Sequence, residues 1–229
     1  MLRINDNARI AGFVGEYEMN KIFSKDMTSH MELLFYRKNE YMVKEGEEIP
    51  YLLFLTEGKA KVFTSLSNGK SLLLCFYQGF KVLGDLEAVD DVKAVTNVQA
   101  IADSLCIGIP YRIVRKYLLE DARFLRYICS SLGGKLNRCS KNSSINLLFP
   151  LENRLASYIY TTGERTLKKP FITFHENLTE IAELLGTSYR HLLRSLSELC
   201  DKNILKKEGS TYIVIDEKTL LTLSADLYK

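Results

Sequence analysis

The chain has 229 residues, of which 46% are hydrophobic and 26% are charged, and its formal net charge is +3. This length is enough for two modest domains, and this composition supports hydrophobic cores and argues against a disordered chain. A charge of +3 is too small to indicate nucleic-acid binding by itself. Any affinity for DNA must therefore come from the local placement of basic residues.

The sequence carries no membrane or secretion signal. No apolar run approaches the roughly 20 residues of a membrane-spanning helix, and Arg3, Asp6 and Arg9 interrupt the apolar core that a signal peptide needs. We therefore expect a cytoplasmic protein without a membrane partner.

Five cysteines are present, an odd number with no CxxC spacing: Cys75, Cys106, Cys129, Cys139 and Cys200. This pattern fits neither a disulfide framework nor a zinc site, so we expect mostly reduced thiols and no bound metal.

Short strands separated by glycines are predicted from about residue 31 to residue 110. Four runs are rich in β-forming residues, at 51–55, 60–63, 71–76 and 106–109. Asn68-Gly69 is the strongest two-residue hairpin signal in the chain. Many short strands at regular spacing predict a small antiparallel barrel or sandwich.

Helical periodicity replaces the strand pattern from about Asp121 to Leu148. Positions in alternating steps of four and three form a heptad seam: Leu125, Cys129, Leu132, Leu136, Cys139, Ser143 and Asn146. Phe124 and Ile128 lie to one side of this seam, where we expect them to pack on the strands. Gly133-Gly134 costs about 1 kcal/mol per residue relative to alanine inside a helix, which favours close approach of a second helix or a hinge over a simple break.

Residues 177–199 predict two short helices around a tight turn, after a helix that Pro150 starts as its first residue. Asn177 and Glu180 have the spacing of a capping box, which satisfies free N–H groups at a helix start. Gly186 suits the left-handed conformation that ends the first helix, and Ser188 can cap the second.

The polar face of the second of these helices is basic. Between Ser188 and Arg194 there is no acidic residue, and the side chains left outside the apolar face are Tyr189, Arg190, His191 and Arg194. Arginine can bridge O6 and N7 of guanine, and tyrosine, histidine and serine can reach phosphates. The pattern is typical of a DNA-reading helix-turn-helix, although a helical corner in another kind of domain is the plainer alternative.

A polar, glycine-containing turn within residues 201–215 predicts a hairpin, and residues 171–174 alternate like a strand. Together with the two helices they would form a winged helix-turn-helix, with Lys206, Lys207 and Ser210 over the DNA backbone. A surface hairpin with ordinary lysines is the competing interpretation.

The order of these elements resembles the CRP/FNR family of bacterial transcription regulators over nearly the whole chain. Residues 43–62 are similar to the family's opening barrel motif, and residues 84–87 lie where cyclic-nucleotide binders have their phosphate-cassette turn. Residues 178–199 carry the most specific match, and within the family residues 187–193 most resemble the YeiL-like branch. The resemblance implies an α+β fold with three parts: a sensor β-roll over residues 1–120, like a cyclic-nucleotide-binding barrel, a dimerisation helix over 121–148, and a winged helix-turn-helix over 149–229.

The resemblance also implies a homodimer that reads double-stranded DNA with a palindromic sequence and, in an activator, contacts RNA polymerase. Residues matching the family's base-reading positions are Tyr189, Arg190 and Arg194, and those matching its backbone contacts are Ser188, His191 and Asn177. Arg190 stands where many members carry a glutamate that accepts a hydrogen bond from cytosine. A guanidinium cannot accept a hydrogen bond, so the family's usual half-site core is not expected.

The roll is expected to sense an effector whose identity the sequence does not give. Its candidate pocket residues are Gly84, Asp85, Leu86 and Lys93. No arginine occurs between Lys81 and Arg112 to hold a phosphate, and Asp85 replaces the glutamate that usually binds ribose, which argues against cyclic AMP. An iron–sulfur cluster has weak support because no cysteine precedes Cys75.

Two further alternatives remain open. Cys129 and Cys139 both fall on the seam, so a thiol switch between subunits competes with the simpler interpretation that they are small hydrophobic residues.

The chain has no GxxxxGK[ST], no GxSxG and no metal-ligand spacing of its histidines, so we do not expect an enzyme. An effector-binding module that contacts proteins instead of DNA is the alternative to a transcription regulator gated by a small molecule or by redox.

Overall fold

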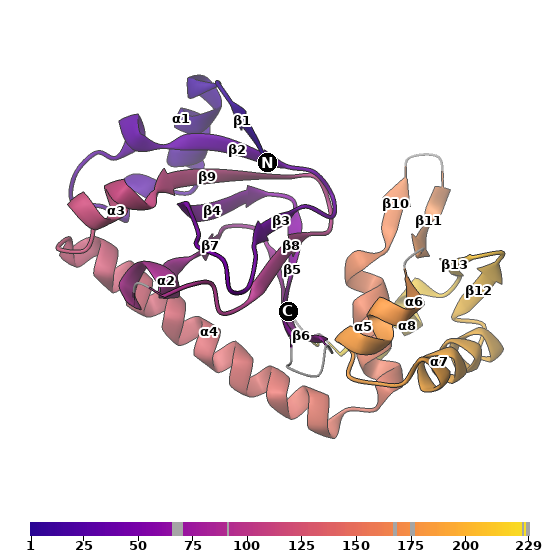
Figure 1. The fold of residues 1–229 in the computed structure, drawn as a ribbon. Coiled ribbons are helices and arrows are strands. Elements are labelled where there is room, and N and C mark those ends of the chain that lie inside the picture. Colours follow the sequence, from indigo (N-terminus) through magenta and orange to yellow (C-terminus); the bar gives the residue numbers. More distant parts are fainter. Residues whose placement is uncertain (66–70, 91, 167–168, 175–176, 226, 228–229) are drawn as a thin grey trace. The chain divides into compact units, whose positions relative to one another are not determined.

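The computed structural model divides the chain into two compact units, residues 1–64 with 76–138 and residues 65–75 with 139–229 (Figure 1). It describes residues 1–65, 71–90, 92–166, 169–174, 177–225 and 227. The predicted α+β fold is confirmed, with antiparallel sheets in the first part of the chain and a helix-turn-helix in the last. Among the described helices, none is long and apolar enough to cross a lipid bilayer.

Two antiparallel sheets make up the β-roll. The first has the order β1 (Leu2–Ile4), β2 (Glu32–Tyr36), β9 (Ser104–Pro110), β4 (Tyr51–Glu57) and β7 (Lys81–Leu83). The second has the order β3 (Tyr41–Val43), β8 (Asn97–Ala100), β5 (Lys59–Ser65) and β6 (Ser71–Gln78). The four predicted strand runs fall within β4, β5, β6 and β9, so they are confirmed. The predicted turn at Asn68-Gly69 lies outside the described residues.

Alternate residues of the central strands build the core that the helices cover. Leu52, Phe54, Ile107 and Ile109 belong to one buried cluster. Because successive side chains of a strand point to opposite faces, Leu53, Leu55 and Cys106 face the other side of the same sheet, where they too are buried. Burial on both faces explains why β4 and β9 read as continuous apolar runs.

Helices close the outer face of this sheet. They are α1 (Asn7–Glu16), the short 3-10 turns η1 (Met19–Lys21) and η2 (Thr28–His30), α2 (Asp85–Asp90), α3 (Tyr111–Tyr117) and the start of α4 (Ala122–Leu148). Phe124 and Ile128 of α4 are buried in the cluster with Phe13 and Phe54, which confirms the predicted packing on the strands. The Phe23 and Phe124 rings stack with centroids 6.1 Å apart.

Asp121 caps the start of α4. Its carboxylate accepts a hydrogen bond from the Arg123 N–H at 2.9 Å and from the Ser24 N–H and hydroxyl at 2.6 and 2.7 Å. Burial by itself would raise the pKa of Asp121, but these hydrogen bonds outweigh it and hold the pKa below its usual value. The helix is therefore anchored at its first turn by a charged cap.

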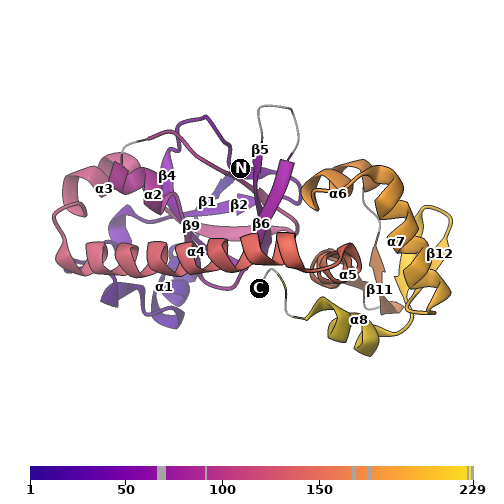
Figure 2. The same ribbon diagram turned by 90° about the horizontal axis from the view of Figure 1, so that it is seen from below.

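The glycine pair does not interrupt α4, which runs as one helix through residues 122–148 (Figure 2). A Cβ built at Gly133 or Gly134 meets nothing within 4 Å, so both glycines present bare backbone at the surface. On the seam, Leu136 is 71% exposed, and Cys129 and Cys139 are exposed as well. The seam positions Ser143 and Asn146 have side chains outside the description.

The second unit holds α5 (Leu151–Thr162), α6 (Leu178–Leu184), α7 (Tyr189–Asp201) and α8 (Glu217–Ser224). Its sheet has the order β10 (Glu164–Thr166), β11 (Lys169–Phe174), β13 (Thr211–Val214) and β12 (Leu205–Glu208). The predicted hairpin and the strand before the helix pair are confirmed, whereas β10 and α8 had not been predicted. Pro150 precedes α5 as its N-cap and is not its first residue, a correction of one position.

Candidate DNA-binding surface and effector pocket

The turn between α6 and α7 has the geometry that its sequence predicts. The Asn177 side chain accepts from the Thr179 N–H at 3.0 Å, and Ser188 Oγ accepts from the His191 N–H at 3.2 Å, so both predicted N-caps are confirmed. Gly186 has a φ of +61°. The N–H groups of Gly186 and Thr187 donate to the carbonyls of Glu183 and Ala182, which closes α6 as a Schellman motif.

Arg154 of α5 forms a hydrogen bond to this turn, a contact that could not be predicted from the sequence pattern around it. Its Nη1 donates to the carbonyl of Leu185, the last residue before the turn glycine. Among the described residues, its Nε is a buried nitrogen without a hydrogen-bond partner. Arg154 is therefore a positioning residue for the helix pair, set by tertiary packing across 31 positions of the chain.

Helix α7 separates an apolar face from a basic one. Leu192, Leu196 and Leu199 are buried, while Tyr189 is 48% exposed and Arg190, His191 and Arg194 are also exposed. Across the described residues, no carboxylate lies within ion-pair distance of Arg190 or Arg194. The first turns of α7 thus present two uncompensated guanidinium groups to solvent.

The wing carries less free charge than its sequence implies. Lys206 forms an ion pair with Glu208 at 2.9 Å, and the Lys207 Nζ lies 5.8 Å from the centroid of the Tyr212 ring. Gly209 takes the left-handed conformation at the tip, with a φ of +61°. Lys207 is exposed, so the wing retains a cation beside the pair formed by Lys206 and Glu208.

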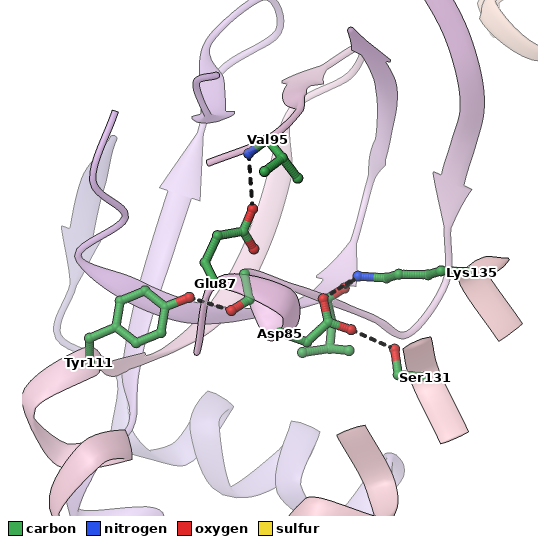
Figure 3. Close-up of polar contacts among 8 residues, drawn as sticks. Asp85, Glu87, Val95, Tyr111, Ser131 and Lys135 are labelled. Atoms are coloured by element: carbon green, nitrogen blue, oxygen red, sulfur yellow. Dashed lines mark hydrogen bonds and ion pairs between the residues drawn. The ribbon is translucent and has the colours of Figure 1, made fainter. Parts of the chain in front are cut away.

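Of the four residues expected to line an effector pocket, Asp85 is held by α4 (Figure 3). Asp85 is 1% exposed, forms an ion pair with Lys135 and accepts a hydrogen bond from Ser131 Oγ at 2.8 Å. Lys135 Nζ also donates to the Val82 carbonyl at 3.0 Å. The carboxylate that replaces the family's ribose-binding glutamate thus contacts two side chains of the chain's own long helix.

The other three expected pocket residues are spread apart. Gly84, with a φ of +82°, accepts a hydrogen bond from the Tyr111 hydroxyl through its carbonyl, and Leu86 is 37% exposed. Lys93 lines a pocket of about 450 Å³ with Glu87, Tyr111 and Arg115. Glu87, which lines this pocket from α2, accepts a hydrogen bond from the Val95 N–H at 3.3 Å (Figure 3). Burial raises the pKa of Tyr111, so its hydroxyl stays a neutral donor.

The cysteines are dispersed. Cys75 and Cys106 are buried in strands, Cys129 and Cys139 are exposed on α4, and Cys200 is half-buried in the last turn of α7. Burial raises the pKa of the Cys106 thiol and of the Cys200 thiol, which makes both poor nucleophiles. Within the described parts of the chain, no three metal-ligating side chains come together.

Comparison with known proteins agrees with this arrangement. The model of the cyclic nucleotide-binding domain matches residues 33–121, and that of the Crp-like helix-turn-helix domain matches residues 153–223. The regulatory protein YeiL of Escherichia coli is 32% identical over 214 residues, which cover 93% of this chain and 95% of that protein. The chain belongs to the CRP/FNR family of transcription regulators.

More distant members of the CRP/FNR family share the fold. A CRP-like cAMP-activated global transcriptional regulator of Mycobacterium tuberculosis is 19% identical, covering 85% of this chain and 88% of that protein. The crystal structure of a CRP/FNR regulator from Eubacterium rectale superposes with a TM-score of 0.74 at 15% identity, covering 87% of this chain and 92% of that one. A CRP-family regulator from Thermus thermophilus gives 0.66 at 19% identity, covering 86% and 98%. This CRP/FNR chain is therefore a DNA-binding transcription regulator and not an enzyme, and the predicted resemblance, including the YeiL-like branch, is confirmed.

Replacing Lys135 with methionine should destabilise this CRP/FNR regulator strongly. The substitution leaves the buried Asp85 carboxylate without its cation, which costs about 3–5 kcal/mol for a broken buried pair. Urea denaturation of Lys135→Met should show this loss, and the double variant Lys135→Met/Asp85→Leu should recover much of it because no buried charge remains.

Lys141→Met is the matched control, because Lys141 is an exposed lysine on the same helix. Its free energy of unfolding should change by less than about 0.5 kcal/mol. Equal stability of the Lys135→Met and Lys141→Met proteins would show that the Asp85 pair does not hold α2 to α4.

Proposed function

We propose that the regulator acts as a homodimer on a palindromic operator, with one α7 helix per half-site, and that a signal at the roll and α4 controls it. The observation that carries the DNA-reading part is the exposure of Tyr189, Arg190 and Arg194 on the first turns of a helix whose other face is buried. In a helix-turn-helix, residues at the start of the second helix contact base edges in the major groove.

The chemistry of these side chains sets what each can read. Arg190 and Arg194 offer only donors, which match O6 and N7 of guanine or a phosphate. Ser188 and His191 lie at the N-terminus of α7, where a phosphate is favoured by the helix dipole and by free N–H groups. Asn177 is in the same position on α6. We therefore assign base reading to the arginines, with Tyr189 beside them, and backbone contacts to the other three.

The dimer is supported by the outer face of α4. Leu136 is 71% exposed in a single chain, and Gly133-Gly134 leaves open space on the same helix. Small residues let two helix backbones approach closely, and the sequence repeat of the seam is the pattern of paired helices. Leu125 and Leu132 of this repeat are partly buried against the core, so Leu136 is the exposed leucine of the seam. CRP-family regulators bind DNA and act as dimers, and the exposed leucine and glycines on α4 support the same pairing for this chain.

For the signal, the residues around α2 do not fit a cyclic nucleotide. Asp85 is committed to Lys135 and Ser131, and no arginine occurs in the sequence between Lys81 and Arg112, where the family's phosphate-binding arginine is expected. In the fold, an arginine from another element, Arg115 of α3, lines the pocket with Lys93. An effector that moves α2 must instead shift the Asp85–Lys135 pair and thereby α4. A thiol switch at Cys129 or Cys139 stays a hypothesis, and so does a contact with RNA polymerase through residues 161–169, which we expected to form a loop and which include strand β10. Residues 167–168 of that loop lie outside the described chain.

Arg194→Ala should weaken binding to the selected operator by about 1–3 kcal/mol and relax the preference at one base pair. The reason is the loss of a two-pronged contact with one base. Gel-shift titration on the operator, on its single-base variants and on random DNA measures both effects. Equal losses on operator and random DNA would contradict the base-reading role.

His191→Ala serves as the matched comparison within α7. A backbone contact does not depend on sequence, so this variant should lose similar affinity for operator and random DNA. Lys218→Ala, an exposed lysine on α8, should bind like the unmodified protein.

Leu136→Glu should shift the protein from dimer to monomer, because two carboxylates would face each other at the centre of the seam. Since Leu136 is largely exposed in one chain, the fold of each subunit should persist. Sedimentation velocity measures the mass, and Asn137→Glu, which adds the same charge at an exposed position outside the seam, should remain dimeric. A dimeric Leu136→Glu protein would contradict the proposed seam.

A further inference from the structure

A second pocket lies in the first unit, and its lining residues do not include any from α2 or the Asp85–Lys135 pair. It has a volume of about 570 Å³, within the usual range of roughly 300–1,000 Å³ for ligand sites. Its walls come from the end of α1 and η1, from the turn between β6 and β7, and from the first turns of α4. We propose that this pocket binds planar aromatic carboxylates.

One wall of the pocket is aromatic. The rings of Tyr17 and Phe80 stack with centroids 4.6 Å apart and planes 12° apart, and Phe80 stacks in turn on Phe54 at 5.7 Å. The ring of Tyr127, which also lines the pocket, has its centroid 6.2 Å from that of Phe54. Such rings form a rigid apolar surface that accepts the flat body of an aromatic molecule.

The part of the pocket that α4 lines carries two cations. Arg123 and Arg126 are three positions apart on α4, both are exposed, and both line the pocket. Over the described residues, no carboxylate lies within ion-pair distance of either guanidinium. Lys21 also lines the pocket, but Glu18 neutralises it in an ion pair. The two arginines are therefore the groups that fit a carboxylate, which guanidinium binds through parallel hydrogen bonds.

Tyr127 also lines the pocket, and its hydroxyl is a neutral donor. No described residue accepts a hydrogen bond from it. Burial, followed by the nearby charge of Asp85, raises the pKa of Tyr127 to about 12, so the hydroxyl keeps its proton near neutral pH. A carboxylate seated on the arginines thus has a further donor within the same pocket.

Dimerisation leaves the pocket open. At 100° per residue, the pocket positions 123, 126, 127 and 130 lie about 140° around α4 from the seam positions 125, 129, 132 and 136. This step alone depends on the proposed dimer, since the pocket itself is complete within one chain. Failure of DNA binding or of dimerisation would therefore not affect the test below.

Isothermal titration calorimetry of the full chain without DNA, with 2-naphthoate as the probe, tests the proposal. We expect saturable binding at one site per chain. Arg126→Gln and Phe80→Leu should each weaken it by roughly tenfold or more, as expected for one charge-assisted contact or one lost ring. Arg112→Gln, at an exposed arginine of α3 outside the pocket, should leave it unchanged.

Ligand controls separate the aromatic contact from the charged one. Hexanoate, which lacks the ring, and 2-naphthalenemethanol, which lacks the charge, should both bind at least about tenfold more weakly than 2-naphthoate. No saturable binding of 2-naphthoate, or equal binding by the Arg126→Gln and Arg112→Gln proteins, would overturn the proposal. Binding of a glutamate-rich peptide in place of 2-naphthoate would also overturn it and would assign the surface to an acidic protein partner. Arg126→Gln keeps the test valid if Phe80→Leu fails to fold, because Arg126 is exposed.

Discussion

The rest of the molecule depends on one constraint, the orientation of α4 about its own axis, because this orientation decides which side chains of α4 face the roll. Phe124 and Ile128 are buried in the core, and one and two turns further on, Ser131 and Lys135 contact Asp85. These four positions follow one another in steps of three and four, so they form a single stripe along the helix. Burial of each apolar side chain contributes about 1.5–3 kcal/mol to stability. Together with the Asp85 contacts, this burial favours a single orientation of α4 about its axis.

That orientation determines what the remaining faces of α4 can do. With the stripe turned toward the roll, Leu136 and Cys129 of the seam are exposed, whereas Leu125 and Leu132 are partly buried against the core. Arg123 and Arg126 border the aromatic pocket. The Asp85–Lys135 pair also joins α2 to the same helix. In the proposed account, a signal received near α2 and the surface that pairs two copies are therefore connected through one buried ion pair, whose partners lie 50 positions apart in the chain.

Local features of the fold could be predicted because they depend on neighbouring residues. The two caps at Asn177 and Ser188, the left-handed Gly186 and the burial of Phe124 each follow from residues a few positions apart. Contacts between distant residues could not be predicted in this way. No periodic pattern in the sequence indicates the hydrogen bond from Arg154 to the Leu185 carbonyl or the stacking of Tyr17 on Phe80. Asp85 shows the limit of resemblance, because its position matched a ribose contact while its actual partners are on α4.

Paired α4 helices that present two α7 helices to one DNA duplex are the central claim, and selection of bound sequences from a random DNA pool by the purified protein tests it most directly. The account predicts enrichment of an inverted repeat whose half-site centres lie about one helical turn apart, roughly 10 base pairs. Enrichment of a sequence without two-fold symmetry, or no enrichment at all, would contradict it.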